Sequence, residues 1–192
     1  DPQFWSSFAD DYNLMVGSPC IDTGDPLSPT DPDGSRADMG AYPFDSSYIG
    51  GPYIYCQAKL NSAGCLPTIS WTGSPTMTGA DDFFVTAESL VNQKPVIGIW
   101  GQSPGSTPFF GGTLCLSNLI VRTPVANSGG SPPAGAPDCT GTTSFHFSQA
   151  YASFWFLSPG DHVFAQFWYR DPAHLDGFGV GLTDALEFVL LP

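Results

Sequence analysis

The stretch SPCIDTGDPLSPTDPDGSRADMGAY, residues 18–42, decides how the first part of this chain can fold. Its four prolines and three glycines argue against a long helix or a central strand, because proline lacks a backbone donor and glycine favours turns. Its five aspartates can accept hydrogen bonds from backbone amides in Asx turns, and we expect Arg36 to pair with one or two of these carboxylates. Short apolar pieces at 14–16 and 39–42 predict brief strands on either side.

The same aspartates form a candidate calcium site. Asp31, Asp33 and Asp38, together with carbonyls of a tight turn, would supply the hard oxygen ligands that calcium prefers. No glutamate closes an EF-hand loop here, and Arg36 competes for the same carboxylates. A hydrogen-bonded turn without a metal is therefore the favoured alternative, and we expect no other cofactor.

The first part of the chain resembles a known scaffold. The segments DPQFWSSFADDYNLMVGSPCID (residues 1–22) and DPDGSRADMGAY (residues 31–42) resemble the last repeat and the final coil of secreted right-handed parallel β-helix proteins. The resemblance implies that residues 1–44 close a β-helix and belong to its scaffold. A β-helix needs several stacked coils to bury a core, whereas at most one or two are present here. We therefore expect the C-terminal piece of a longer protein, or a subunit that completes this segment with the strands of another chain.

The N-terminal segment is also the predicted assembly surface. An isolated coil leaves its backbone edges and its apolar face open, and a second copy can cover both. A head-to-tail contact of this kind builds a filament unless its rotation closes a ring. The alternative is that the segment packs on itself or folds back on its own chain. The side chains expected to take part in assembly are Phe4, Trp5, Phe8, Tyr12, Leu14 and Val16.

The charge balance limits the kinds of partner. The chain carries 18 acidic and 5 basic side chains, a net charge of −13, and only 12% of its residues are charged, against about 25% in typical domains. The acidic excess argues against nucleic acid and anionic membrane surfaces, since both need cationic contacts. No apolar run is long enough for a transmembrane helix, so we expect no membrane insertion. The chain shows no signal peptide and does not begin with Met, which indicates a mature or processed form, or a fragment.

Residues 45–52 (DSSYIGGP) are predicted to be a linker, and residues 53–192 an all-β domain. Short apolar runs alternate there with Gly, Pro, Ser and Asn turns, which favours a disulfide-stapled β-sandwich of the jelly-roll kind. The run VFAQFWY at 163–169 is apolar almost throughout and indicates a central strand. The expected strands are 53–60, 67–71, 83–89, 96–100, 113–121, 142–147, 152–157, 162–169 and 185–191.

Five cysteines without CxxC spacing indicate disulfides in an oxidising compartment, extracellular or at the cell surface, rather than a zinc site. We predict that Cys56 pairs with Cys65 around a hairpin, and that Cys115 pairs with Cys139 around a loop rich in Gly and Pro. Cys20 would then remain a free, buried thiol.

Residues 52–192 also resemble a known module. The motifs YCQAKLNSAGC (55–65), GGTLC (111–115), FWYRD (167–171) and LTDALEF (182–188) resemble, in order and spacing, a C-terminal β-module of large secreted proteins from environmental bacteria. The resemblance implies an extracellular accessory or structural role, and it brings no catalytic residues with it.

Catalytic chemistry has little support in the sequence. The histidines His146, His162 and His174 are scattered, and no GxSxG motif presents a nucleophile to any of them. Asp171 and Asp176 flank a loop but lack a recognisable glycosidase context. We therefore expect that the chain is not an enzyme.

These observations favour a non-catalytic extracellular structural or assembly module, such as a filament or surface-layer subunit, whose partners are its own copies. The alternative is a carbohydrate-binding accessory domain of a larger secreted β-helix enzyme or adhesin, whose partner is a polysaccharide. That alternative needs two or three aromatic rings in a flat row on one face. The candidate stacking residues are Trp71, Trp100, Trp155 and Trp168.

Overall fold

The residues that the computed structural model describes are 2–6, 11–15, 18–44, 51–132 and 137–192. Its contacts divide the chain into two compact units, Asp1–Gly51 (unit 1) and Pro52–Pro192 (unit 2). The fold is nearly all β, with several antiparallel sheets and two disulfides, which confirms the predicted fold class at this level.

Unit 1 contains one antiparallel strand pair. β1 (Phe4–Ser6) pairs with β2 (Asp11–Leu14), and Phe4 lies opposite Leu14. Leu14 lies against Gly40 and is only 2% exposed. Successive coils of a parallel β-helix stack their strands in parallel, so this pair is not itself such a stack, and the resemblance to a β-helix coil stays a prediction.

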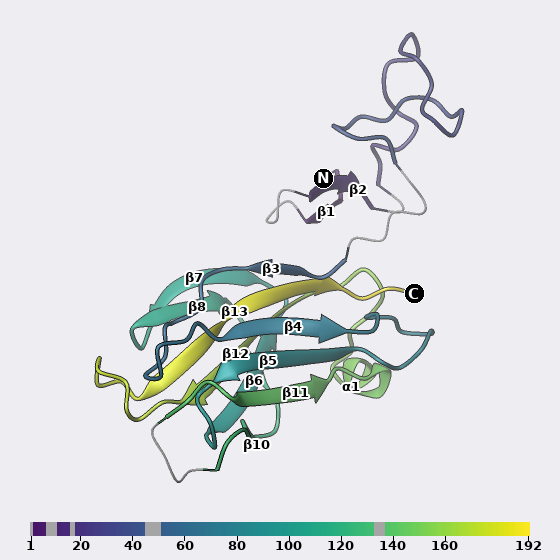
Figure 1. Ribbon diagram of the computed structural model, residues 1–192. Coiled ribbons are helices and arrows are strands. Elements are labelled where there is room, and N and C mark those ends of the chain that lie inside the picture. The colour runs from purple at the N-terminus through teal and green to yellow at the C-terminus, as the bar shows by residue number, and fades with distance from the viewer. Residues whose placement is uncertain (1, 7–10, 16–17, 45–50, 133–136) are drawn as a thin grey trace. The chain divides into compact units, whose positions relative to one another are not determined.

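Unit 2 is built on a six-stranded antiparallel sheet (Figure 1). Its strand order is β10-β6-β12-β13-β3, and the short β9 also pairs with β6. β12 lies between β6 and β13, which confirms the central strand predicted from the apolar run. The strands of this sheet are β3 (Tyr53–Tyr55), β6 (Pro95–Gly101), β9 (Val121–Arg122), β10 (Ala126–Asn127), β12 (His162–Arg170) and β13 (Val180–Val189).

A smaller sheet of three strands, in the order β11-β5-β4, packs on one face of the six-stranded sheet. The core between the sheets contains fully buried side chains from both, among them Val85, Val163 and Phe188. The helix α1 adds Ala152 to the same core. The elements of this layer are β4 (Thr68–Thr72), β5 (Phe84–Leu90), β11 (Gly141–His146) and α1 (Gln149–Phe154).

A hairpin of β7 (Pro104–Phe109) and β8 (Gly112–Leu116) packs on the opposite face of the six-stranded sheet. There Leu116 of β8 joins Ile99 of β6 and Phe164 of β12 in a second buried cluster. β12 is therefore buried on both faces, which explains why its sequence is almost continuously apolar instead of alternating. The finer prediction, a jelly-roll connection of the strands, stays a prediction.

One expected strand is a helix. Residues 152–157 belong to α1 and to the turn that follows it. Ser148 caps this helix, because its side chain accepts a hydrogen bond from the backbone amide of Tyr151. The local cap therefore prevails over the strand preference of the aromatic residues that follow.

Two other expected strands are interrupted by left-handed residues. The strand expected at 53–60 ends at Tyr55, and Cys56 follows with a φ of 68°. The strand expected at 113–121 is divided into β8 and β9, and Asn118 between them has a φ of 61°. In unit 1, residues 39–42 form bends rather than the expected strand.

Candidate functional site

The four cysteines of unit 2 form two disulfides, but the predicted pairing is wrong. Cys56 is bonded to Cys115 and Cys65 to Cys139, with Cα–Cα distances of 6.2 and 6.3 Å. The segment between Cys56 and Cys65 is not a hairpin, so its ends do not meet. Instead one end is tied to β8 and the other to the segment before β11. Cys20 of unit 1 is a free thiol and is half-buried rather than buried.

Lys59, which lies between these two disulfides, holds three loops together. Its Nζ donates to the carbonyl oxygens of Phe110 and Val180, each at 2.8 Å, and lies 2.5 Å from Asp176 Oδ2. The hydrogen bond from Lys59 holds the pKa of Asp176 below its ordinary value. This arrangement, called the Lys59 latch here, buries a cation with its acceptors in place, which is the way that a charge is accommodated inside a protein.

Asp171, in the same 171–179 loop as Asp176, is a second carboxylate that links this loop to the segment between Cys56 and Cys65. Asp171 is fully buried and accepts hydrogen bonds from Ser62, from the backbone amide at 2.8 Å and from the hydroxyl at 2.5 Å. Asp171 and Asp176 therefore both connect the 171–179 loop to the disulfide-bonded segment.

The candidate calcium ligands lie in unit 1 and bind backbone amides. Asp31 accepts a hydrogen bond from the amide of Asp38, and Asp33 accepts one from the amide of Ser35. The Ser35 side chain first, and then this amide, lower the pKa of Asp33. The side chain of Asp38 in turn accepts a hydrogen bond from the backbone amide of Asp22 at 2.7 Å. The described carboxylates lie in a hydrogen-bonded turn, and no cluster of three or more metal-ligating side chains occurs among the described residues. The calcium site stays a prediction.

Arg36 does not pair with these carboxylates as expected. Its Nε donates to the carbonyl oxygen of Gly24 at 2.8 Å, and Nη2 reaches the same oxygen. Since the amide of Gly24 also donates to the carbonyl oxygen of Ala37, Arg36 closes the turn through the backbone rather than through a salt bridge.

Each histidine faces a carboxylate. His146 Nε2 lies 3.2 Å from Asp81 Oδ1, and His162 Nδ1 lies 2.8 Å from the buried Glu187. His174 contributes to the Lys59 latch, since its Nδ1 lies 2.9 Å from Asp176. Within the described ranges, none of the three histidines hydrogen-bonds a serine or cysteine side chain. That the chain is not an enzyme stays a prediction.

The predicted assembly residues are only partly visible. Phe4 and Tyr12 meet edge-to-face at 5.4 Å, and Tyr12 stays exposed. Leu14, in contrast, is buried within the chain and offers no open surface. Phe8 and Val16, and the side chain of Trp5, lie outside what the structure describes.

The candidate stacking tryptophans do not form a flat row. Trp100 is buried, Trp71 and Trp168 are half-buried, with Trp71 packed against the core, and Trp155 is exposed. The planes of Trp100 and Trp155 cross at 83°, and those of Phe154 and Trp155 at 90°. A flat platform for sugar rings is therefore not formed by the tryptophans of unit 2.

The end of α1 carries three neighbouring exposed aromatic side chains, here called the aromatic tip: Phe154, Trp155 and Phe156. Phe154 is 70% exposed and Phe156 is 92% exposed. Trp155 contacts the rings of Trp100 and Tyr151, which anchors the tip to the core. Phe156 has a φ of 58°, in the left-handed region that costs a residue with a Cβ about 1–2 kcal/mol.

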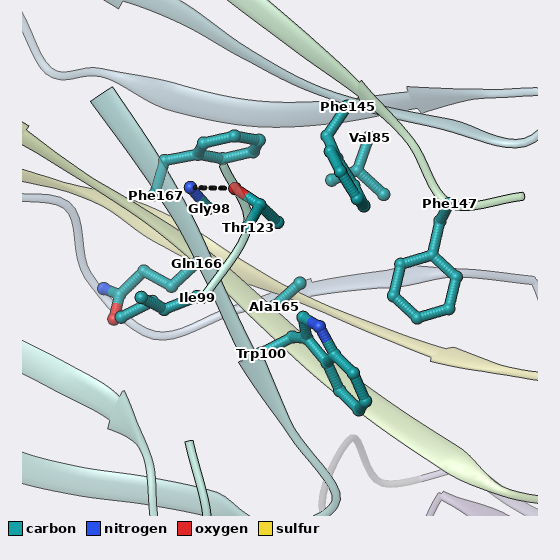
Figure 2. Close-up of a pocket in the computed structure, with 10 residues that line it drawn as sticks. All are labelled: Val85, Gly98, Ile99, Trp100, Thr123, Phe145, Phe147, Ala165, Gln166 and Phe167. Atoms are coloured by element: carbon teal, nitrogen blue, oxygen red, sulfur yellow. Dashed lines mark hydrogen bonds between the residues drawn. The ribbon is translucent and has the colours of Figure 1, made fainter. Parts of the chain in front are cut away.

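The space between the two sheets is too small for a ligand. Figure 2 shows its lining by aromatic and aliphatic side chains of β5, β6, β11 and β12 and of the segments next to them. The amide of Gly98 donates to Thr123 Oγ1 at 2.9 Å on one side of it. Its volume of about 20 Å3 leaves room for a single water at most. This cavity belongs to the core.

A larger hollow lies on the face of the six-stranded sheet away from the smaller sheet. Its volume is about 140 Å3. The indole Nε1 of Trp168, in its lining, is buried and has no hydrogen-bond partner among the described residues. This hollow is called the Trp168 trough here, and its lining residues are Pro95, Ile97, Val125, Trp168, Tyr169 and Arg170.

Comparison with known proteins gives no assignment: no family model, no curated protein and no solved structure matches the chain.

Sequence reasoning missed both surfaces of unit 2. For the Trp168 trough a signal was present: Trp168 and Arg170 are two residues apart in a strand, and such residues share a face. For the aromatic tip, the run FWF was assigned to a strand, where alternate rings would have been buried. The exposure of Phe154 and Phe156 became visible only once α1 was known.

Proposed function

We propose that this chain is a non-catalytic extracellular structural module that assembles with its own copies, and that the aromatic tip is one of its contact surfaces. The observation that carries the proposal is Phe156. Its side chain contributes almost no burial to the fold, yet its backbone is held in a strained conformation. Phe156 is the residue that ends α1, since its amide donates to Ser153 and the next amide, of Leu157, donates to Ala152. Glycine is the usual residue at such a left-handed position, so an exposed phenylalanine there is typical of a side chain kept for a contact.

The surroundings of Phe156 support a contact with another protein surface. The segment 148–160 contains no charged residue, and Trp155 and Tyr151 hold the tip against the core. Aromatic side chains that are rigidly held lose little entropy on binding, and they are enriched in the centres of protein interfaces. Two exposed phenylalanines beside the anchored ring of Trp155 therefore form an apolar surface suited to such a contact.

A second copy is the occupant that we propose for the tip. Unit 1 exposes large apolar side chains of its own, which would complement an uncharged aromatic surface. Contact between the tip of one copy and unit 1 of the next is head-to-tail, and such contacts continue into a filament unless they close a ring. The exposed apolar side chains of unit 1 are Tyr12, Leu27, Met39 and Tyr42.

The compartment fits this proposal. Two disulfides are compatible with an extracellular, oxidising environment. They would also keep each subunit rigid outside the cell, since each of them closes a long segment of the chain.

Light scattering on the intact chain and on the variant Phe156→Gly tests the proposal. The intact chain is expected to form larger species as its concentration rises, and Phe156→Gly to shift them towards the monomer. The free energy of unfolding is expected not to fall, because relief of about 1–2 kcal/mol of strain offsets about 1 kcal/mol of added chain entropy.

Leu175→Ser is the matched control, since Leu175 is fully exposed but lies in the 171–179 loop. A variant beginning at Asp45 tests the contribution of the N-terminal segment. A monodisperse monomer at high concentration would refute the proposal, and so would unchanged assembly in both Phe156→Gly and the shortened chain.

A further inference from the structure

The Trp168 trough is formed by alternate residues of neighbouring strands. Trp168 of β12 lies opposite Ile97 of β6, and Tyr169 lies opposite Val96. Val96 and the Tyr169 ring belong to the core between the two sheets, so the side chains of Ile97 and Trp168 project from the other face. Arg170, two residues beyond Trp168, also lines the trough. The trough is therefore an apolar floor with a guanidinium at one end.

A second guanidinium lies along the same face. Arg122 of β9 lies opposite Ile99 of β6, and paired residues of adjacent strands project from the same side of a sheet. Ile99 is two residues beyond Ile97, so Arg122 follows the trough along β6. Arg122 and Arg170 are both exposed, and neither is within ion-pair distance of an acid in the part of the chain that the structure describes.

This placement uses both arginines of unit 2. The unit has four cationic side chains: Lys59 forms the latch, Lys94 is outside the lining of the trough, and Arg122 and Arg170 lie along the trough. In a chain with a net charge of −13, such a gathering around one apolar hollow indicates an anionic ligand. Charges farther than about 8 Å are largely screened at physiological salt, so the local cations dominate.

The size and lining of the trough define the ligand further. A volume of about 140 Å3 is close to that of the cavity of about 150 Å3 that holds benzene, which is the size of one six-membered ring. The indole and the aliphatic walls suit a ring with an apolar face, and a sugar ring presents such a face of C–H groups. A guanidinium binds a carboxylate through two parallel hydrogen bonds. One ring with a carboxylate attached satisfies all three features.

We propose that the Trp168 trough binds a uronic-acid residue of an extracellular acidic polysaccharide. The sugar ring lies in the apolar trough, and Arg170 binds its carboxylate. Arg122 binds the carboxylate of the next acidic residue along the polymer. A neutral sugar would leave both guanidinium groups without a partner. Nucleic acid fits less well, since its dense charge requires more cations than this face provides.

The experiment is calorimetric titration of the intact protein with short oligomers of galacturonic acid, with the methyl-esterified oligomers as the uncharged comparison. Binding is expected for the acid and not for the ester. Arg170→Gln is expected to weaken binding by about tenfold or more, as for a lost charged hydrogen bond, and Arg122→Gln to weaken it mainly for the longer oligomers. Both side chains are exposed, so the substitutions leave the fold intact.

Leu175→Glu is the matched control, because it changes the net charge by the same amount at a fully exposed site outside the trough. Its affinity is expected to equal that of the unchanged protein. No binding of the acid at millimolar concentration, equal binding of acid and ester, or unchanged affinity in the double variant of Arg122 and Arg170 would each overturn the proposal. An acidic peptide that binds when the uronate does not would overturn the ligand class. The aromatic tip is not touched by these variants, so this test is independent of assembly.

Discussion

Lys59 shows what a buried charge requires in a protein with few cations. Its ammonium group has two carbonyl acceptors and one carboxylate, and its stem passes beside Gly112 of the β7–β8 hairpin. The ring of Phe178 lies 5.9 Å from Nζ and adds a weak cation–π contact. These groups come from the β7–β8 hairpin, the 171–179 loop and the first residue of β13, so the lysine stabilises the way in which these segments meet rather than any one of them.

Lys59→Met is therefore expected to be strongly destabilising. The variant keeps the apolar stem but leaves Asp176 and two carbonyl oxygens without their donor, a loss of about 3 kcal/mol. Chemical denaturation measures the free energy of unfolding. Lys94→Met is the control, expected to change it by less than about 0.5 kcal/mol, because Lys94 has no ion pair among the described residues. Equal losses in the two variants would contradict the latch.

Asp184 predicts a pH dependence of stability. Burial raises the pKa of Asp184 above its ordinary value of 3.8, although the amide of Ile69 donates to it at 2.6 Å and lowers it in part. A raised pKa in the folded state means that ionisation costs stability. This loss of stability is absent below pH 3.8, where the carboxyl group is protonated in both states. It grows as the pH rises from 3.8 through the folded-state pKa, and it is constant above that.

Asp184→Asn is expected to keep the hydrogen bond from Ile69 and to remove the buried charge. The melting temperature of the variant should therefore exceed that of the unchanged protein at pH 7, and the difference should vanish towards pH 3. Thermal unfolding across this range provides the measurement. A variant that is less stable at pH 7 and equal at pH 3 would show instead that the ionised carboxylate is stabilising.

At the scale of elements, the sequence was informative where burial dictates composition. The run at 163–169 predicted a central strand because a strand covered on both faces must be apolar at nearly every position. The expected strands at 67–71, 83–89 and 96–100 correspond closely to β4, β5 and β6. Each of these is flanked by turn residues, so both its ends were visible in the sequence.

The sequence was uninformative where a single residue decides the local path. The Ser148 cap turns an aromatic run into a helix, and the left-handed Cys56 ends β3 early. β7 was not expected because Pro104 and Pro108 argue against a strand. It occurs in a two-stranded hairpin, where a proline can leave its missing donor on the open side.

The disulfides illustrate a limit of a different kind. Spacing along the chain favours cysteines that are close in sequence, but the bonds join residues that are 59 and 74 positions apart. Pairing depends on how the layers stack, and one sequence does not reveal this. The same holds for the Trp168 trough, since Arg122 and Arg170 come together only when β9 and β12 join the same sheet through β6.

At the scale of the whole molecule, the two units differ in how they are stabilised. Both disulfides and both buried clusters lie within unit 2. In unit 1, Leu14 is the one large apolar side chain that is fully buried among the described residues. A unit with so little buried apolar surface has little to offset the entropy of ordering its chain. Unit 1 is therefore expected to open at a much lower free energy than unit 2.

A chain that begins at Pro52 tests this difference. The main unfolding transition of unit 2 is expected at the same temperature in the shortened and in the intact chain, because no disulfide and no member of either buried cluster is removed. Hydrogen exchange on the intact chain should show rapid exchange in 18–44 and slow exchange in β12 and β13. Both measurements belong at low concentration, where assembly does not add stability to unit 1. A clear drop in the transition temperature of the shortened chain would show that unit 2 depends on unit 1, and the two would then have to be treated as one cooperative fold.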